Sequence, residues 1–455
     1  MPAGPAPGQF TFSTSEPFSA RISAILRAWN TDPVTERPQT SIQIVWRALW
    51  TSRLVILFSG IVGVVQIGVP GGATSAYDPT NLTAPFGYLA NAVVAPLARW
   101  DSVWYLTIAR YGYAHIRERM AFYPLYPALI HVLAWVTRSD LVAGVLISMV
   151  SFAVALVLLH RLVRLDFDEE IANTTVILIA FCPVSFFLSA VYTESLFLAL
   201  SVGVIYAARR ERWLLCGVLG FLAALSRNGG IALIVPAAII YLYGPRDAPL
   251  TRWGVAGIQG FRRLLPRHRT GAEALWLLLI PAGLCAYLAY LGIKYGDGLA
   301  PFRVESIWYR HTAFPLSSAW QGIKQAWDGL RQLVQGPLPP YHVPAYAQSV
   351  ISAALQDIYL FLFLVLGVIG LICVASQLGA AYALYTLALL VLSLADPVSL
   401  QPLASLPRYE LMIFPLFIWG AKWLTRRNLV GYAIPALAVL LGVFTIEFAT
   451  WRWVA

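Results

Sequence analysis

Residues 351–374 read ISAALQDIYLFLFLVLGVIGLICV, an apolar run with one charged residue, Asp357. A run of about twenty apolar residues is long enough to cross the roughly 30 Å hydrocarbon core of a bilayer as one α-helix. The rest of the chain is similar: 59% of its 455 residues are hydrophobic and 12% are charged, with a mean hydropathy of +0.68. Ordinary soluble domains carry about 25% charged residues. The sequence therefore predicts an all-α polytopic membrane protein.

Apolar runs recur along the chain and predict a bundle of about 10–12 transmembrane helices. The predicted spans are Leu54–Val69, Leu141–Leu159, Ile171–Ala190, Leu196–Ala207, Trp213–Leu225, Ile231–Tyr243, Ala274–Ile293, Ile351–Val374, Ala380–Leu394, Leu411–Leu424 and Val430–Ile446. Residues 1–50 are polar and rich in Pro, Ser and Thr, which predicts a flexible cytosolic N-terminal tail before a transmembrane domain over 51–455. Two long segments rich in Trp, Tyr and Pro, 70–140 and 294–350, are predicted to be amphipathic loops on the extracytoplasmic face.

The net charge of +10 reflects membrane orientation rather than a nucleic-acid partner. Arg residues form short clusters between the apolar runs, for example at Arg161 and Arg164, at Arg209 to Arg212 and from Arg246 to Arg269, as the positive-inside rule requires. These clusters predict the cytosolic side of a multi-pass integral membrane protein. Lys is rare and Arg is abundant, which favours a bacterial cell membrane; a eukaryotic source would favour the endoplasmic reticulum membrane. All four Cys lie in apolar segments, with no spacing typical of a disulfide framework or a zinc site.

Two segments do not fit simple spans. Phe122–Val136 is apolar but contains Pro124 and Pro127, and counting it as a crossing would move the Arg209 cluster outside, so we interpret it as a re-entrant or interfacial helix. The apolar runs on either side of Ser226–Gly230 are each shorter than a crossing requires, which predicts a hairpin within the membrane's outer half.

Asp101 is the leading candidate for a chemical role. It lies among aromatic residues in the stretch Arg99-Trp100-Asp101-Ser102-Val103-Trp104-Tyr105, at a predicted membrane surface. A carboxylate in such surroundings is costly to desolvate and therefore usually has a partner or a function. Asp is also a common helix cap, so a capping role for the following helix is an equal alternative. Trp104 and Tyr105 are candidate substrate-binding residues in the same stretch.

Other polar residues are predicted at the outer face. Arg227 and Asn228 lie at the hairpin tip, and Arg408 precedes a span; a guanidinium matches phosphate, although an interfacial Arg more often snorkels or pairs with a carboxylate. Glu194 lies in a very short outer turn, where it is a site residue, a solvated turn residue or the start of the next helix. Trp308 and Arg310 are candidates for binding a sugar, with interfacial anchoring as the commoner use of Trp.

The sequence lacks several signatures of soluble enzymes. It contains no glycine-rich phosphate loop, no H-E-x-x-H, no G-x-S-x-G and no D-x-D metal motif. The sequence therefore predicts no metal ligand set, and a requirement for a divalent metal remains open.

An ordered set of motifs resembles the PIG-V-like mannosyltransferases of the GT-C superfamily. These motifs are Trp100 to Tyr113, Phe122-Tyr123-Pro124-Leu125-Tyr126-Pro127, Tyr192-Thr193-Glu194-Ser195, Ser226-Arg227-Asn228-Gly229, Gly296-Asp297 to Trp308-Tyr309-Arg310, and Pro407-Arg408-Tyr409. The resemblance implies a GT-C-type catalytic domain over 51–455. It also implies inverting transfer of a sugar, mannose in this family, from a polyprenyl-phosphate donor on the extracytoplasmic face.

The resemblance implies roles for individual residues as well. Asp101 matches the proposed general base, and Arg227 and Arg408 are candidates to hold the departing phosphate. Eukaryotic relatives act on a GPI precursor, but the polar N-terminal extension favours another glycolipid, a glycan or a secreted protein as acceptor. The competing hypotheses are a transporter or flippase of lipid-linked sugars and a non-catalytic membrane scaffold.

Overall fold

Helices account for nearly all regular structure in the computed structural model, which describes residues 38–244, 270–336 and 350–454. Contacts divide the chain into two units, Met1–Ile44 and Val45–Ala455. Only residues 38–44 of the first unit are described, as the start of a helix, so most of the predicted tail and the basic loop from Arg246 to Arg269 lie outside the described residues. The account below concerns the second unit.

The all-α membrane class is confirmed by the length and composition of the helices. Among the described residues, five helices are long and apolar enough to cross a membrane: Ser41–Ile67, Asp140–Val163, Ala272–Tyr295, Ile351–Gln377 and Val430–Ala449. Less than half of each apolar stretch is buried inside the protein, between 22% and 44%, so most of its apolar surface faces outward. A helix that is apolar on its outer side is the expected form of a membrane span.

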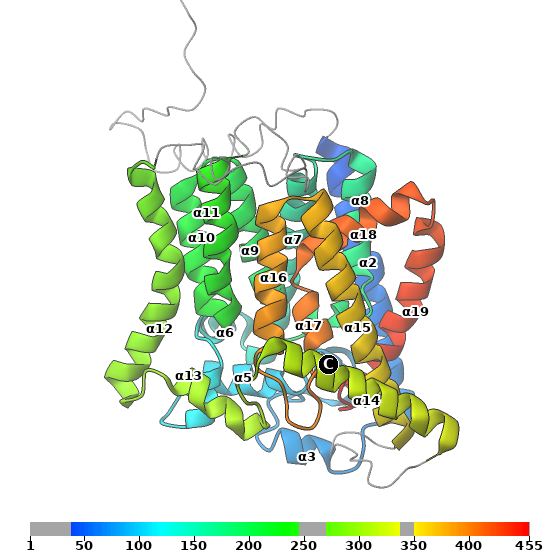
Figure 1. Ribbon diagram of the computed structural model, residues 1–455. Helices are drawn as coiled ribbons and strands as arrows, with labels where there is room; N and C mark the ends of the chain where they lie inside the picture. The colour runs from blue at the N-terminus through cyan, green and yellow to red at the C-terminus, as the bar shows by residue number, and fades with distance from the viewer. Residues whose placement is uncertain (1–37, 245–269, 337–349, 455) are drawn as a thin grey trace, which may run out of the picture. The chain divides into compact units, whose positions relative to one another are not determined.

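The named helices follow one another along the chain, and Figure 1 shows most of them. They are α2 (Pro38–Val62), α3 (Ala73–Tyr77), α4 (Tyr88–Val94), α5 (Asp101–Tyr111), α6 (Leu125–Thr137), α7 (Asp140–Val163), α8 (Glu169–Ala180), α9 (Glu194–Arg209), α10 (Trp213–Ser226), α11 (Ile234–Tyr243), α12 (Leu279–Tyr295), α13 (Ala300–Arg303), α14 (Pro315–Gln335), α15 (Val350–Gln377), α16 (Ala380–Leu394), α17 (Leu406–Glu410), α18 (Phe414–Arg426) and α19 (Val430–Ala449).

Two boundaries differ from the sequence prediction. Helix α2 begins at Pro38, inside the segment predicted to be a flexible tail, because Ile42, Trp46 and Trp50 supply apolar residues before the predicted span. The predicted span Ile171–Ala190 is helical only to Ala180, and a short 3-10 helix, Ser185–Leu188, carries the chain onward to α9.

Helix α6 contains only thirteen residues, Leu125–Thr137. At 1.5 Å per residue it is about 20 Å long, shorter than the hydrocarbon core. It is therefore too short to cross a membrane alone, and its interpretation as a re-entrant or interfacial helix stays a prediction.

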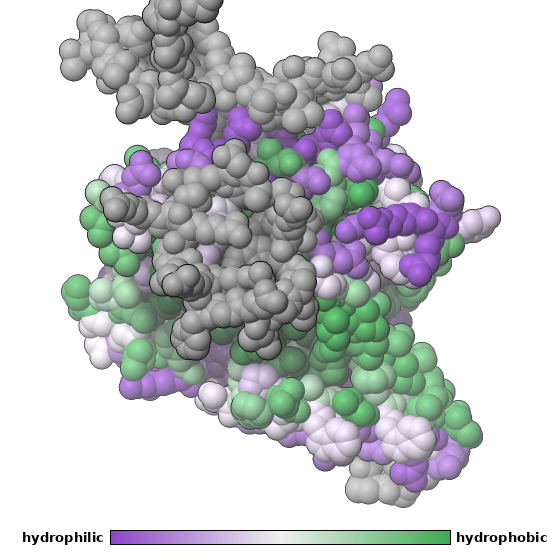
Figure 2. All heavy atoms as spheres, turned by 45° about the horizontal axis from the view of Figure 1, so that its top comes forward, coloured by the Kyte–Doolittle hydropathy of each residue, from purple (hydrophilic) through white to green (hydrophobic). Residues whose placement is uncertain are grey.

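Short helices gather at one end of the bundle. In Figure 1, α3, α5, α13 and α14 lie at the lower ends of the long helices, and α14 runs across them. The C-terminal end of α9 lies at the opposite end, where Arg209 pairs with Asp166 after α7 at 2.6 Å. Figure 2 turns this opposite end forward and shows hydrophilic residues around it, with hydrophobic residues on the flank below.

Candidate active site

The first residue of α5 is Asp101. Trp100, which precedes it, has a φ of 54° in the left-handed region, a conformation that is unfavourable for a bulky side chain. Its indole ring packs against Tyr77, Trp451 and Trp453, with ring centroids 4.7 to 5.7 Å apart. This packing holds the sharp bend that starts α5 and directs the Asp101 side chain.

The alternative role for Asp101 as a helix cap is not observed. The N-cap residue of α5 is Trp100, without a side-chain cap hydrogen bond, and Asp101 is already within the helix. Its carboxylate binds Arg408 instead. A negative charge in the first turn is still favoured by the helix dipole.

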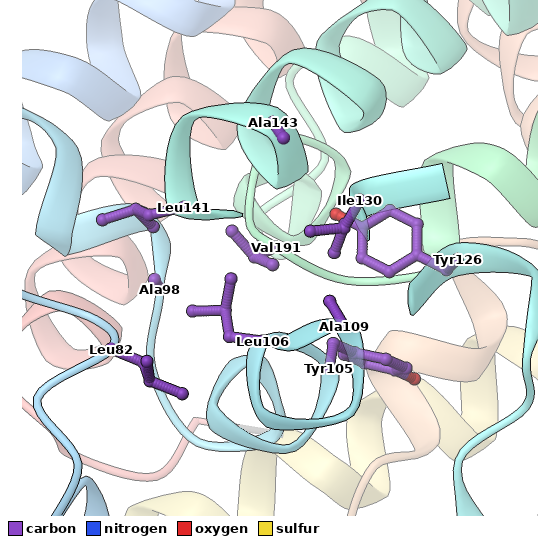
Figure 3. Close-up of a cluster of buried hydrophobic side chains, with 10 residues drawn as sticks. All are labelled: Leu82, Ala98, Tyr105, Leu106, Ala109, Tyr126, Ile130, Leu141, Ala143 and Val191. Atoms are coloured by element: carbon purple, nitrogen blue, oxygen red, sulfur yellow. The ribbon is translucent and has the colours of Figure 1, made fainter. Parts of the chain in front are cut away.

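A buried apolar cluster fixes α5 beneath the site. Leu106 and Ala109 of α5 pack with Tyr126 and Ile130 of α6 and with Val191 from the turn before α9, as Figure 3 shows. Leu106, Tyr126 and Ile130 have no exposed surface. Because these contacts join α5, α6 and the Val191 turn, the positions of Asp101 and Glu194 depend on the same core.

Four charged side chains form one network: Asp101, Glu194, Arg227 and Arg408. The Arg408 Nη1 donates to the Asp101 Oδ2 at 2.5 Å, and its Nε donates to the Glu194 Oε1. The Arg227 Nη1 donates to the same Glu194 oxygen at 2.6 Å. Glu194 therefore lies between the two guanidinium groups and joins the hairpin tip to α17.

Burial makes this network unlike a set of surface ion pairs. The Glu194 side chain is fully buried, and those of Arg408 and Arg227 are 7% and 11% exposed, whereas that of Asp101 is 25% exposed. Buried charges are costly unless they are paired, and here two carboxylates offset two guanidinium groups. The interpretation of Glu194 as a solvated turn residue is wrong, because no part of its side chain meets solvent.

Aromatic rings hold the two arginines in place. The Arg408 guanidinium lies over the Tyr192 ring at 4.5 Å from its centroid, and that of Arg227 lies over the Tyr409 ring at 4.9 Å. The Tyr192 hydroxyl accepts from the Asp101 backbone N–H at 3.2 Å and donates to the Arg99 carbonyl at 3.1 Å. Tyr192 thus supports both members of the Asp101–Arg408 pair.

A cavity of about 40 Å³ adjoins Arg227. Its polar lining comes from the hairpin tip, from the segment after α13 and from the end of α16. The residues concerned are Arg227, Asn228, Glu305, Arg310, Ser393, Asp396 and Tyr409. Arg310 is held there because its Nη1 donates to the Asp396 carbonyl at 2.8 Å and its Nη2 donates to the Ser405 Oγ at 3.2 Å.

The remaining candidate residues lie around this centre. The Trp104 and Trp308 rings meet edge to face at 5.7 Å, and both contact Phe122. The Tyr105 hydroxyl lies 3.4 Å from the Thr193 Oγ1. Asn228 is exposed, and its side-chain oxygen accepts from the Gly229 N–H at 2.8 Å.

Sequence analysis did not single out Glu305, Asp396 or Tyr409. Glu305 lies within the Gly296 to Arg310 motif, and Tyr409 follows Arg408 in another motif. Both could therefore have been predicted as site residues from their position in these motifs. Asp396 follows the apolar α16, and nothing local predicts that it meets a residue from the preceding loop.

The donor set does not fit a metal ion. Within the described residues, no group of three or more His, Cys, Asp or Glu side chains is placed to hold one. The carboxylates of Asp101 and Glu194 face guanidinium groups, which already neutralise them. We therefore derive no step through a metal.

Long apolar helices and a buried ion-pair network at one end of their bundle define a multi-pass integral membrane protein with a polar site. Residues 45–234 match the family model described as Mannosyltransferase (PIG-V), so the resemblance seen in the motifs is confirmed for this region. The matched region contains Asp101, Glu194 and Arg227.

Curated relatives point to the same family. GPI alpha-1,6-mannosyltransferase 2 of Rattus norvegicus is 31% identical over 37% of this chain and 37% of its own length. GPI mannosyltransferase 2 of Schizosaccharomyces pombe is 30% identical over 29% of each chain. The chain thus spans about a third of the length of the curated relatives it matches.

Among solved structures, the archaeal oligosaccharyltransferase AglB of Archaeoglobus fulgidus, in complex with an inhibitory peptide and a dolichol-phosphate, is 13% identical with a TM-score of 0.36. The match covers 89% of this chain and 56% of that chain. A TM-score this low does not establish a shared fold.

Proposed function

We propose that the protein is an inverting mannosyltransferase that moves mannose from a polyprenyl-phosphate donor to an acceptor hydroxyl on the extracytoplasmic face. The acceptor belongs to a glycolipid, a glycan or a protein. The observation that carries the proposal is the network in which Arg408 and Glu194 hold Asp101 at the edge of a buried polar site. The named activity of the relatives supports the choice of mannose.

Asp101 is the proposed general base. Arg408 occupies its Oδ2, and within the described residues no hydrogen bond reaches its Oδ1. The free oxygen accepts the acceptor's hydroxyl proton while the acceptor oxygen bonds to the anomeric carbon. The bond from that carbon to the phosphate oxygen breaks, and its electron pair leaves with the polyprenyl phosphate, which needs no proton from a general acid.

The two arginines have different proposed roles. Arg408 is engaged by both Asp101 and Glu194, so it is a positioning residue for the base. Arg227 uses one nitrogen for Glu194 and also lines the cavity, where its charge stabilises the negative charge that develops on the leaving phosphate. This assignment differs from the expectation that both arginines hold the phosphate.

The test is transfer from radiolabelled polyprenyl-phosphate mannose to membrane lipid and glycan acceptors by purified protein. Asp101→Asn preserves shape and removes the base, so we expect at least a hundredfold loss of rate with an unchanged elution profile. Asp328→Asn is the matched control, because Asp328 lies on α14 with 55% of its side chain exposed. A parallel reaction with a chelator tests a metal requirement.

Each outcome separates the hypotheses. Equal transfer by wild type and Asp101→Asn would remove Asp101 from the mechanism. Absence of transfer, combined with movement of the labelled lipid across proteoliposomes, would favour the flippase alternative. Absence of both would favour the scaffold.

A further inference from the structure

Together with the adjoining ion-pair network, the cavity contains one carboxyl group more than the guanidinium groups can balance. Glu305 and Asp396 line it together with Arg227 and Arg310. Counting the adjoining network as well, four carboxyl groups, those of Asp101, Glu194, Glu305 and Asp396, meet three guanidinium groups, those of Arg227, Arg310 and Arg408. In a partly buried site this excess of one negative charge is unfavourable, and binding one proton removes it.

The proton belongs to Glu305, which lines the cavity beside Asp396. Asp101 and Glu194 each bind an arginine at short distance, whereas the closest approach of the Arg310 Nη1 to the Asp396 Oδ2 is 3.8 Å. Burial and the neighbouring Asp396 carboxylate raise the pKa of Glu305 to about 8. The other charged or titratable groups that face Glu305 are Arg227, Arg310 and Tyr123.

Both arginines in the cavity retain donors for a ligand. The Arg227 Nη1 donates hydrogen bonds to Glu194 and Thr193, and within the described residues its Nη2 has no acceptor. Arg310 is fixed by Ser405 and Asp396 with its side chain 15% exposed, so its guanidinium is preorganised. Fixed guanidinium groups match the oxygens of a phosphate group.

One side of the cavity is apolar and reaches the protein surface. Phe197, Leu389 and Met412 line it in the interior, and Leu392 of α16 lines it with 40% of its surface exposed. A ligand with a charged head and a hydrocarbon tail can place its head between the arginines and its tail along this apolar side. A prenyl phosphodiester has these two parts and carries a single negative charge.

Building on the proposed function, we propose that this cavity binds the phosphodiester head group of the lipid-linked sugar between Arg227 and Arg310, next to the Glu305 carboxyl group. When Glu305 is ionised, the seven groups carry a net negative charge and repel the anionic donor. Donor binding therefore requires a proton on Glu305, and it weakens as Glu305 loses that proton.

The experiment measures binding and turnover between pH 6 and 9.5 with a short-chain prenyl-phosphate mannose, a phosphodiester whose own charge is constant over this range. For wild type we expect donor affinity to fall about tenfold between pH 7 and pH 9, the loss that one proton with a pKa near 8 produces. Glu305→Gln should bind the donor with little dependence on pH. Arg310→Lys should raise the donor KM at least tenfold while acceptor KM changes little.

Binding measured in the Asp101→Asn protein separates this proposal from the proposed function. The same pH dependence of donor affinity in that variant would support donor binding in the cavity even if Asp101 were not the base. A pH-independent affinity in wild type, an unchanged slope in Glu305→Gln, or the absence of phosphodiester binding would each overturn it. Mannose alone and dimethyl phosphate are the control ligands that show which part of the head group is recognised, and Asp328→Asn is the control variant that should match wild type.

Discussion

At the scale of single residues, burial determines what a charged side chain does. Glu194 is the first residue of α9, where the sequence alone allows a solvated position, yet it is fully buried between Arg227 and Arg408. Asp101, one contact further along the network, retains a quarter of its side chain exposed. The Glu194 carboxylate therefore has a structural position inside the network. The Asp101 carboxylate is accessible to a substrate.

Glu194→Gln should destabilise the protein as well as inactivate it. The substitution keeps the volume but removes the negative charge between two buried guanidinium groups, and breaking a buried pair costs roughly 3–5 kcal/mol. Thermal unfolding in detergent, monitored by intrinsic fluorescence, measures the loss. Asp328→Asn, which disrupts only an exposed pair on α14, should change stability by less than about 0.5 kcal/mol, and equal effects for the two variants would contradict the argument.

Stability should also fall as the pH rises toward the pKa of Glu305. Folding raises that pKa from its ordinary value to about 8, because the carboxyl is buried beside Asp396. The folded state therefore binds the proton more tightly than the unfolded state, so the stabilisation is complete below about pH 4.5 and is lost progressively up to about pH 8. Melting temperatures measured from pH 5 to 9 should show this decline, and Glu305→Gln should flatten it.

At the scale of helices, small residues determine how closely α10 and α12 pack. A Cβ atom on Gly283 of α12 would lie 2.3 Å from the Phe221 carbonyl oxygen of α10. Backbone atoms cannot move aside at small cost, so Gly283→Ala should separate the helices and destabilise the protein by about 1–3 kcal/mol. Folded yield and thermal unfolding report this change.

Gly292 provides the matched control on the same helix. A Cβ atom there meets nothing closer than the Gly298 Cα at 3.6 Å, an ordinary van der Waals distance. Gly292→Ala should be neutral or stabilising, because Ala has the higher helix propensity. A similar loss of stability in both variants would show that close packing at Gly283 is not the cause.

Helix α14 packs on the protein through small residues and leaves its large apolar side chains outside. Gly322 and Gly329 contact Leu403 and Ala354, which brings the helix close to its neighbours. The exposed apolar stripe consists of Leu316, Trp320, Ile323, Trp327, Leu330 and Val334. Such a helix is typical of the membrane interface, with its apolar side toward the acyl chains.

Spin labels should detect this orientation. In protein carrying Cys285→Ala and Cys373→Ala, a nitroxide introduced by Trp327→Cys should be more accessible to oxygen, and one introduced by Asp328→Cys should be more accessible to a soluble nickel chelate. The two positions are adjacent but lie on different faces of α14. Equal accessibility in lipid vesicles would contradict an interfacial position.

At the scale of the second unit, the positions of charged residues predict its topology. Arg426 and Arg164 line one open pocket, and Arg209 pairs with Asp166 nearby, so the Arg-rich helix ends meet at the end of the bundle away from Asp101. The positive-inside rule places this end in the cytosol. The Asp101 network would then lie toward the extracytoplasmic side, as a lipid-linked donor on that face requires.

Labelling of introduced cysteines tests this topology. A membrane-impermeant maleimide should react with Ser306→Cys, near the cavity, in right-side-out vesicles and with Arg427→Cys in inverted vesicles, because both positions are exposed at opposite ends. The cysteine-substituted background used for α14 removes the Cys285 and Cys373 signals. Labelling of both positions from one side would contradict the topology and the proposed face of transfer.

The sequence by itself determined the membrane class and the resemblance to the PIG-V family, which the family model matches over residues 45–234. Long apolar runs such as 351–374 require helices, since a backbone in hydrocarbon must satisfy its own hydrogen bonds. Local motifs around Asp101, Glu194, Arg227 and Arg408 identified candidate residues, because the chemistry of each is visible in its own neighbourhood. The sequence prediction did not place the start of α2 at Pro38, because the first turns of this helix contain polar residues before the apolar run begins.

Only the tertiary structure decided which of these residues meet. Asp101 and Arg408 are 307 positions apart. Glu305 lies in the short 3-10 helix Val304–Trp308, and Asp396 lies just after α16. Such pairings depend on how helices pack, and the period of apolar residues along one helix does not specify its neighbour. Burial, which places Glu194 between two arginines and raises the pKa of Glu305, is likewise a property of the packed bundle rather than of the local sequence.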